Sequence, residues 1–253
     1  GLIMSECNVA TFDFGGTNMR AATVSVKGFD WRVLDRQHRP TPNYLLAPHI
    51  PAGQRLDDLL DFLTSYASSS RLRFGAEAVV AAIPGPIQGA GTVLALATIL
   101  GPDSQTLCPI DLAAQISSRL PEMQVKVMND VSAAGYRFVQ NGTDFAVFTL
   151  GSGIGLKVFL DGQPRVGPHG LGGELTHMVF DARPDAPLCD CGGKGHLGAL
   201  ASGRAWVRVE TEAHEANCAP DLARFTEPLA RAVAMLHFAL GLERFIFAGG
   251  LTE

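Results

Sequence analysis

The fold is decided by the stretch Val9-Ala10-Thr11-Phe12-Asp13-Phe14-Gly15-Gly16-Thr17-Asn18-Met19-Arg20, in which a β-type run carries an aspartate into two consecutive glycines. Glycine allows a tight turn and a close approach to a ligand, because no Cβ is in the way. Backbone N–H groups and the Thr17 hydroxyl can then hold a phosphate, with Asp13 placed to attract a hydrated Mg²⁺. The turn leads into a second strand, so it matches neither common glycine-rich nucleotide motif. The alternative is an ordinary Gly-Gly hairpin turn.

Length and composition limit the class of protein. The chain has 253 residues, 47% of them hydrophobic and 18% charged, which is typical of a well-packed soluble protein with one large or two modest domains. A net charge of −5 and the lack of a Lys/Arg block argue against a nucleic-acid surface. No apolar run approaches the ~20 residues of a membrane span, and residues 1–7 do not resemble a signal peptide. Cys189 and Cys191, one residue apart, favour a metal site in a reducing compartment. We therefore expect a cytoplasmic protein without nucleic-acid or membrane partners.

The first half of the chain is expected to alternate strands and helices. Leucines from Leu56 to Leu63 recur at helical spacing, and Pro84-Gly85-Pro86 ends a short buried strand. Asp130 is expected to cap the helix that starts at Val131. The expected elements are strands over 9–14, 21–26 and 31–34, a helix around 56–66, a strand over 78–83, a helix over 110–120 and a strand over 125–128.

The same pattern returns in the second half. A strand over 145–150 leads into Gly151-Ser152-Gly153-Ile154-Gly155 and a return strand over 156–160. Two such glycine hairpins predict two similar α/β lobes around a shared cleft, which we place at residues 1–122 and 123–253. A nucleotide in that cleft would touch one loop from each lobe. The remaining expectations are an irregular insertion over 162–195, helices near 198–217 and 228–240, and a strand over 244–248 before Gly249-Gly250.

The motifs, taken in order, resemble those of the ROK sugar kinases (repressor, open reading frame, kinase) of the actin-like ATPase superfamily. Residues 13–20 resemble the D-x-G-G-T-x-x-R phosphate loop of that family, and the resemblance covers nearly the whole chain. The motifs that follow in the family's order are Pro84-Gly85-Pro86, Asn129-Asp130, Gly151–Gly155, Glu174-Leu175-Thr176-His177, the segment Cys189–His196 and Ala248-Gly249-Gly250.

The resemblance implies a fold, a reaction and partners. The fold would be the α/β, ribonuclease H-like fold of actin-like ATPases, with two similar lobes around a nucleotide and sugar cleft. The reaction would be the glucokinase-like transfer of a phosphoryl group from Mg-ATP to a hexose or N-acetylhexosamine, at the 6-hydroxyl. Dimers are common in the family, which makes a homodimer a candidate assembly, although no segment of the sequence indicates an interface.

The resemblance also assigns the nucleotide contacts. The second glycine loop resembles the family's second phosphate loop, and the last glycine pair resembles the turn against the adenosine. For each, the alternative is a plain turn. The expected phosphate and nucleotide contacts are Asp13, Gly15, Gly16, Thr17, Asn18, Arg20, Gly151, Ser152, Gly153, Gly249 and Gly250.

Asp130 is the candidate catalytic base. Phosphoryl transfer needs positioning, charge stabilisation and a group that takes the acceptor's proton, and a carboxylate at a strand end beside a helix N-terminus meets the last need. Asp130 could instead only cap the helix, and the two roles are compatible. Resemblance to the Asn-Asp pair of the family favours catalysis, with Asn129 and Asp130 contacting the sugar.

The residues His177, Cys189, Cys191 and His196 look like a structural zinc site. They offer two thiolates and two imidazoles, the ligand types that tetrahedral zinc prefers. Thiols in so glycine-rich a loop are poor core residues. Family members usually carry a third cysteine where His196 stands. Histidine is an acceptable ligand, but its longer side chain leaves the alternative that no metal binds.

The sugar contacts depart from the family pattern. By resemblance Glu174 and His177 contact sugar hydroxyls, with Thr176 in place of the usual glycine. Gly198 stands where the family has a sugar-binding glutamate, and Thr98 is nearest to the position of a sugar-binding asparagine. Because such sites discriminate through hydrogen bonds to hydroxyl groups, the acceptor differs from the usual hexose or binds weakly.

Two rival functions remain open. One is a catalytically weak or inactive sugar sensor of the same fold, without a DNA-binding segment because twelve residues precede Asp13. The other is an actin-like phosphotransferase with a non-sugar acceptor, which the segment from Glu174 to His196 argues against. Family members also continue for tens of residues beyond the position of Glu253, including a helix near the nucleotide. If that helix is absent, nucleotide binding is expected to weaken.

Overall fold

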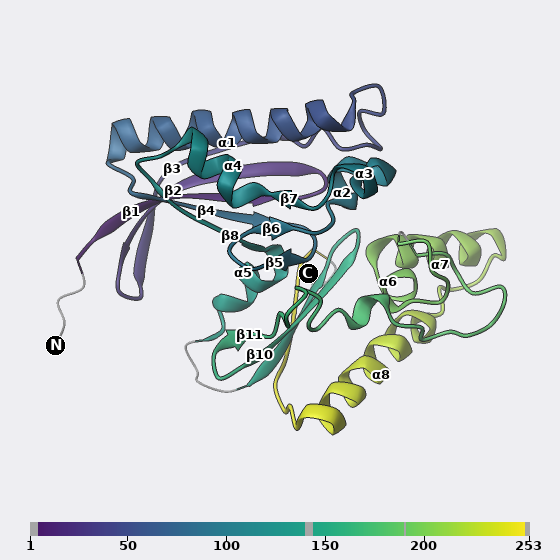
Figure 1. The fold of residues 1–253 in the computed structure, drawn as a ribbon. Helices are drawn as coiled ribbons and strands as arrows, with labels where there is room; N and C mark the ends of the chain where they lie inside the picture. The colour runs from purple at the N-terminus through teal and green to yellow at the C-terminus, as the bar shows by residue number, and fades with distance from the viewer. Residues whose placement is uncertain (1–4, 140–143, 190, 251–253) are drawn as a thin grey trace. The chain divides into compact units, whose positions relative to one another are not determined.

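The computed structural model describes residues 5–139, 144–189 and 191–250 (Figure 1). It divides into two compact units. Unit 1 extends to Ala133 and adds Pro168–Leu171, whereas unit 2 comprises Ala134–Gly167 and the chain from Gly172 onward. The division into lobes between residues 122 and 123 stays a prediction, and so do the expectations for residues 251–253, which lie outside the described residues. No helix in the described part of the chain is long and apolar enough to cross a membrane.

Unit 1 is built on a five-stranded sheet with the order β3-β2-β1-β4-β8. β1 pairs antiparallel with β2 and parallel with β4, so the first glycine turn joins two central strands. Every second residue of β2 is buried from Met19 to Ser25, as the two-residue repeat of a strand requires. The strands are β1 (Cys7–Phe14), β2 (Asn18–Lys27), β3 (Asp30–Pro40), β4 (Ala78–Ile83) and β8 (Gln124–Asn129).

Two helices cover one face of this sheet (Figure 1). α1 (Ala52–Phe74) packs on β1 and β2, and it ends where Gly75 adopts a left-handed φ of 66°. α4 (Leu112–Arg119) packs on β8. The helix expected from residue 110 begins at Leu112, because the Asp111 carboxylate caps it by accepting the N–H of Ala114 at 2.9 Å.

Short elements connect β4 to α4. A small sheet with the order β5-β6-β7 and three short helices fill this part of unit 1. They are β5 (Ile87–Gln88), β6 (Thr92–Val93), α2 (Ala97–Leu100), η1 (Gly101–Asp103), α3 (Ser104–Leu107) and β7 (Ile110–Asp111). α5 (Asp130–Tyr136) follows β8 directly.

Unit 2 contains a four-stranded sheet with the order β11-β10-β9-β12. β9 pairs antiparallel with β10 and parallel with β12. The order β10-β9-β12 therefore repeats the order β2-β1-β4 of unit 1, with a glycine turn in each hairpin. This repeat agrees with the two similar α/β lobes that the sequence predicts. The strands are β9 (Phe145–Leu150), β10 (Ile154–Leu160), β11 (Gln163–Pro164) and β12 (Phe245–Ala248).

Among the described residues of unit 2, apolar side chains of α6 and α8 share a core with β9 and β10. The expected helix over 198–217 is two helices, because the Ser202 side chain accepts the N–H of Ala205 and starts a new one. The expected helix at Pro228 begins six residues earlier, where Asp221 caps it. The helices are η3 (Leu175–His177), α6 (Leu197–Leu200), α7 (Gly203–Glu215) and α8 (Leu222–Leu240).

Candidate active site

The first glycine loop closes the β1–β2 hairpin. The N–H of Gly15 donates to the Asn18 carbonyl at 2.9 Å, and Phe14 and Met19 form the last pair of the ladder. Asp13 lies opposite Arg20 in register, and the Arg20 guanidinium donates to the Asp13 carboxylate at 2.9 Å. Both side chains are at least half exposed. The Asp13 carboxylate is therefore held at the end of β1, beside the loop.

Two buried residues after β3 support this loop. The Thr41 hydroxyl donates to the Gly15 carbonyl at 2.7 Å, and the Asn43 amide donates to the Gly16 carbonyl. The backbone N–H of Thr41 also donates to the Thr17 carbonyl at 2.9 Å. Sequence reasoning missed Thr41 and Asn43, since an isolated Thr and Asn in a loop carry no recognisable signal.

Thr98 lies against the first glycine loop. A Cβ at Gly16 would come within 2.8 Å of the Thr98 γ-methyl carbon, so a side chain at Gly16 would force Thr98 to move. Thr98 is exposed on α2. Thr98, which stands nearest to the position of the family's sugar-binding asparagine, therefore lies next to Gly16 of the predicted phosphate loop.

Asn129 and Asp130 stand at the junction of β8 and α5. The Asn129 carboxamide oxygen accepts the N–H of Ser132 at 3.0 Å, so Asn129 caps α5, and the expectation that Asp130 caps it is wrong. The Asn129 amide in turn donates to the Gly85 carbonyl and to the Asp130 carboxylate, both at 3.0 Å. One Asp130 oxygen also accepts the N–H of Val131 at 2.8 Å. Asn129 is buried, and Asp130 is half-buried. Asn129 is thus held in place by its hydrogen bonds, and it orients the Asp130 carboxylate.

The Pro84-Gly85-Pro86 turn fixes the support for Asn129. Gly85 has a φ of 114°, and a Cβ there would collide with the Ala95 carbonyl oxygen. Only glycine fits this position, so its carbonyl is available to Asn129 for a geometric reason.

The second glycine loop lines a cavity of about 500 Å³ within unit 2. The loop is closed by a bond from the Gly151 N–H to the Gly153 carbonyl at 2.9 Å. The first residues of α7 meet it, since the Gly203 N–H donates to the Gly151 carbonyl at 2.8 Å. The residues that line the cavity are Gly151, Ser152, Gly203, Arg204, Trp206, Val207 and Gly250. The structure therefore brings the second loop and the last glycine pair to one cavity.

Sequence reasoning missed the α7 side of this cavity. Trp206 is half-buried and packs edge-on against Phe225, with ring centroids 5.6 Å apart. Gly249 has a φ of 113° and lies against the Leu150 carbonyl, where a Cβ would collide. A cavity wall made of glycine backbone, a helix N-terminus and an indole suits a ribose-phosphate and a flat base.

Glu174 is held by Lys157, a residue for which no role was predicted. The Lys157 ammonium on β10 donates to the Glu174 carboxylate at 3.1 Å and to the Gly172 carbonyl at 2.8 Å. Lys157 is 1% exposed, whereas the Glu174 side chain is 24% exposed. A lysine in the middle of an apolar strand is the signal that could have pointed to a buried partner.

The structure brings together the four predicted metal ligands. One ligand atom from each of His177, Cys189, Cys191 and His196 lies within 4.8 Å of all the others. In a tetrahedral site with bonds of about 2.0–2.3 Å, ligand atoms lie about 3.3–3.8 Å apart, so a small contraction would suffice. The Cys191 sulfur lies 3.1 Å from the His196 Nδ1, and the Cys189 sulfur lies 3.9 Å from the His177 Nδ1. This donor set and spacing fit a structural zinc ion, and His196 reaches the cluster despite replacing a cysteine.

Backbone hydrogen bonds shape the loop that carries these ligands. The Cys189 N–H donates to the Gly193 carbonyl at 2.8 Å, and the Gly195 N–H donates to the Pro187 carbonyl at 2.8 Å. Gly195 has a φ of 65° and its Cβ would collide with the Asp181 carbonyl. The glycines are therefore a geometric requirement of the ligand loop.

Gly198 lies next to the metal cluster. A Cβ at this position would come within 3.3 Å of the Thr176 carbonyl and 3.6 Å of the Cys189 sulfur. A side chain there would be tightly placed. The position at which the family carries a glutamate is thus close-packed here.

The comparisons with known proteins agree with this picture. The ROK family model matches residues 9–253. A C(7)-cyclitol 7-kinase of Streptomyces hygroscopicus subsp. jinggangensis is 32% identical, over 99% of this chain and 81% of its own length. An N-acetylmannosamine kinase of Escherichia coli is 33% identical over 76% of this chain and 60% of its own length.

Solved structures match the fold. The ROK hexokinase of Thermus thermophilus aligns with a TM-score of 0.70 at 23% identity, covering 97% of this chain and 82% of the hexokinase. A ROK glucokinase of Streptomyces griseus, solved with glucose and AMPPNP, aligns with a TM-score of 0.70 at 23% identity, over 98% of this chain and 84% of its own. The chain therefore belongs to the ROK family, as one of its sugar kinases, and it has the actin-like ATPase fold of that family.

Proposed function

We propose that the chain transfers the γ-phosphoryl group of Mg-ATP to the 6-hydroxyl of a hexose or N-acetylhexosamine, with Asp130 as the general base. The observation that carries this proposal is that Asn129, and not Asp130, caps α5. Asn129 caps α5 and donates to the Asp130 carboxylate, so Asp130 is oriented without serving as the cap. A positioned carboxylate that takes the acceptor's proton contributes about 10²- to 10⁴-fold to such reactions.

The glycine loops would bind the nucleotide. The first loop offers backbone groups and the Thr17 hydroxyl to phosphate, and Asp13 would support the hydrated Mg²⁺ from its place beside Arg20. In unit 2, the cavity between the second loop, Gly250 and Trp206 would take the adenosine. The Trp206 indole in its wall offers a flat apolar face that suits a purine ring.

The acceptor contacts would be Asn129, Asp130, Thr98, Glu174 and His177, as the family resemblance implies. Glu174 is held by Lys157, and His177 belongs to the metal cluster. A zinc ion at His177, Cys189, Cys191 and His196 would supply rigidity to this loop and no chemistry of its own.

A C(7)-cyclitol is a second candidate acceptor. The relative that matches 99% of this chain is named a C(7)-cyclitol 7-kinase. Gly198 and Thr98 already depart from the hexose pattern, and a glutamate at the close-packed Gly198 would disturb its neighbours. A cyclitol phosphorylated at an exocyclic hydroxyl uses the same base and phosphate sites, so only the hydroxyl contacts would differ.

A coupled assay of ADP release tests the proposal. The panel would hold glucose, mannose, N-acetylmannosamine, N-acetylglucosamine and a C(7)-cyclitol, with phosphorylated products located by NMR. We expect acceptor-dependent ADP release that Asp130→Asn removes. Calorimetric binding of an acceptor without turnover would instead favour the inactive sensor. A homodimer, which the family resemblance suggests, and a cytoplasmic location, which the cysteine pattern suggests, belong to the same proposal.

A further inference from the structure

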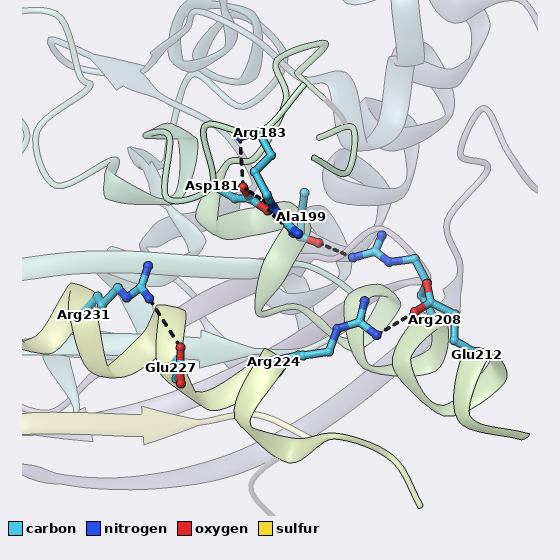
Figure 2. Close-up of polar contacts among 8 residues, drawn as sticks. All are labelled: Asp181, Arg183, Ala199, Arg208, Glu212, Arg224, Glu227 and Arg231. Atoms are coloured by element: carbon cyan, nitrogen blue, oxygen red, sulfur yellow. Dashed lines mark hydrogen bonds and ion pairs between the residues drawn. The ribbon is translucent and has the colours of Figure 1, made fainter. Parts of the chain in front are cut away.

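A second cavity of unit 2 is lined by arginines (Figure 2). It measures about 280 Å³ and lies between α7, α8 and the segment that precedes Cys189. None of its described lining residues also lines the cavity at Gly151. Among the residues that the structure describes, its charged lining consists of four guanidinium groups and two carboxylates, namely Arg183, Arg208, Arg224, Arg231, Asp181 and Glu227.

Arg208 is the anchor of this cavity. It is half-buried, and its guanidinium donates to the Ala199 carbonyl at 2.7 Å, a neutral acceptor. Within residues 5–139, 144–189 and 191–250, no carboxylate lies at ion-pair distance from Arg208. A guanidinium carries five N–H donors, and this hydrogen bond uses one of them. Arg208 therefore retains both charge and donors toward the cavity.

The other three arginines have carboxylate partners that they can exchange. Arg183 lies 2.7 Å from Asp181, Arg224 lies 2.7 Å from Glu212, and Arg231 lies 3.4 Å from Glu227. All three guanidinium side chains are more than half exposed. Exposed ion pairs contribute little to stability, because water and salt compete with them. Arg224 and Arg231, whose carboxylate partners are also exposed, can therefore turn toward an incoming anion at small cost.

Positive charges outnumber negative charges among the described residues that line the cavity. The described part of the wall holds four cations and two anions, although the chain as a whole has a net charge of −5. Glu212 and Asp185 lie outside the lining and act on Arg224 and Arg183. The hydrogen bonds from Arg183, and more weakly the charge of Arg231, lower the pKa of Asp181 to about 2. The Asp181 carboxylate therefore interacts electrostatically with Arg231 of α8 and with Arg183 of its own segment.

We propose that this cavity binds a small phosphate-bearing anion, with Arg208, Arg224 and Arg231 holding the phosphate. Guanidinium groups bind phosphate oxygens in pairs, which makes arginine better suited than lysine to this task. The volume falls just below the ~300 Å³ at which small-molecule pockets commonly begin, so the ligand is phosphate itself or a small phosphate monoester. The carboxylates of Asp181 and Glu227 remain to accept hydrogen bonds from hydroxyl groups, which favours a phosphorylated polyol over free phosphate.

Backbone hydrogen bonds connect the arginine-lined cavity to the loop that carries the metal ligands. Arg183 and Asp181 belong to the segment between His177 and Cys189. The N–H groups of Phe180 and Asp181 both donate to the Gly195 carbonyl, at 2.7 and 3.0 Å, next to His196. Ligand binding at the arginines would therefore stabilise the loop that carries the metal ligands. This makes the cavity a candidate regulatory site, independent of the transfer reaction itself.

Calorimetric titration of the full chain tests the proposal. Inorganic phosphate and glucose 6-phosphate would be titrated separately, with saturating Mg-AMPPNP present so that the glycine loops are occupied. We expect a dissociation constant at or below about 1 mM for at least one of them. Arg208→Gln, which keeps a donor for the Ala199 carbonyl, should weaken binding about tenfold, and the double variant with Arg231→Gln should abolish it. Arg36→Gln, an exposed arginine of unit 1, is the matched control and should bind as the unaltered chain does.

The relative affinities for glucose 6-phosphate and inorganic phosphate distinguish the two candidate ligands. Tighter binding of glucose 6-phosphate, with the advantage lost in Glu227→Gln, would identify a phosphorylated polyol as the ligand, and equal binding would identify phosphate. Circular dichroism spectra of the variants exclude unfolding, and Arg208→Lys should restore part of the affinity. Absence of binding, or binding that the double variant leaves unchanged, would overturn the proposal. Neither result depends on catalysis, so failure of the proposed kinase function would be recognised separately.

Discussion

Lys157 and Glu174 form an ion pair in which the cation is buried and the carboxylate reaches the surface. The Lys157 ammonium is 3.1 Å from one Glu174 oxygen and also donates to the Gly172 carbonyl. A buried ammonium must be paired, since its desolvation is costly. The lysine therefore determines where the Glu174 carboxylate points, and with it the sugar contact that we assign to Glu174.

Replacement of Lys157 by methionine should raise the KM for the acceptor about tenfold and leave the KM for ATP nearly unchanged. Methionine matches the length of the lysine stem but leaves Glu174 without its partner. Loss of one member of a buried pair costs about 3–5 kcal/mol, and we expect less here because water can reach Glu174. Steady-state kinetics with each substrate varied separately would measure the split, and thermal unfolding would show a lowered Tm.

Lys27→Met is the matched control, because Lys27 is exposed at the end of β2. It should change neither KM. Equal effects of Lys157→Met on both substrates would show a general loss of structure and contradict a positioning role.

Asp130→Asn should lower kcat by at least about 100-fold while the fold is retained. The cap of α5 is supplied by Asn129, so the loss of the Asp130 charge leaves that cap in place. Asp111→Asn is the matched control, because Asp111 also begins a helix and asparagine caps as well as aspartate. Single-turnover rates and circular dichroism spectra would be compared. Comparable activity of the two variants would remove Asp130 from the role of base.

The fold was predictable where local chemistry dominates. The Gly15-Gly16 turn, the strands on either side and the repeat at Gly151 follow from glycine conformation and strand patterns. The choice between Asn129 and Asp130 as the cap was not predictable, because both residue types cap helices well and stand side by side. Ser202 posed the same difficulty, since the apolar pattern around it continues.

The site was predictable where motifs are contiguous and unpredictable where partners are distant. The metal ligands lie within 20 residues, so their spacing alone indicates the site. Lys157 and Glu174 are 17 positions apart in different elements, and no local pattern links them. Arg208 and Arg231 share a cavity only because α7 and α8 pack together. Such contacts depend on tertiary packing, which a single sequence does not specify.

Cys191→Ser should remove the metal from the purified protein and lower its Tm. The variant keeps three of the four ligands but loses a thiolate, and structural zinc sites of this kind contribute directly to folding. Cys218→Ser is the matched control, because Cys218 is also exposed and lies outside the cluster. Inductively coupled plasma mass spectrometry would count zinc in both. A protein that is folded, active and free of zinc without any substitution would contradict the structural metal site.

Trp206→Ala should raise the KM for ATP about tenfold and leave the KM for the acceptor unchanged. Stacking of a base on an aromatic side chain is worth about 1–3 kcal/mol, and Trp206 is the aromatic residue that lines the cavity at Gly151. Trp206→Phe keeps an aromatic face and should lose less. Trp31→Ala is the matched control, because Trp31 is 70% exposed on β3 of unit 1. Calorimetric binding of AMPPNP gives the same comparison without turnover. If Trp206→Ala binds AMPPNP as tightly as Trp31→Ala does, the base does not occupy this cavity, and the adenosine contact assigned to Gly250 fails with it.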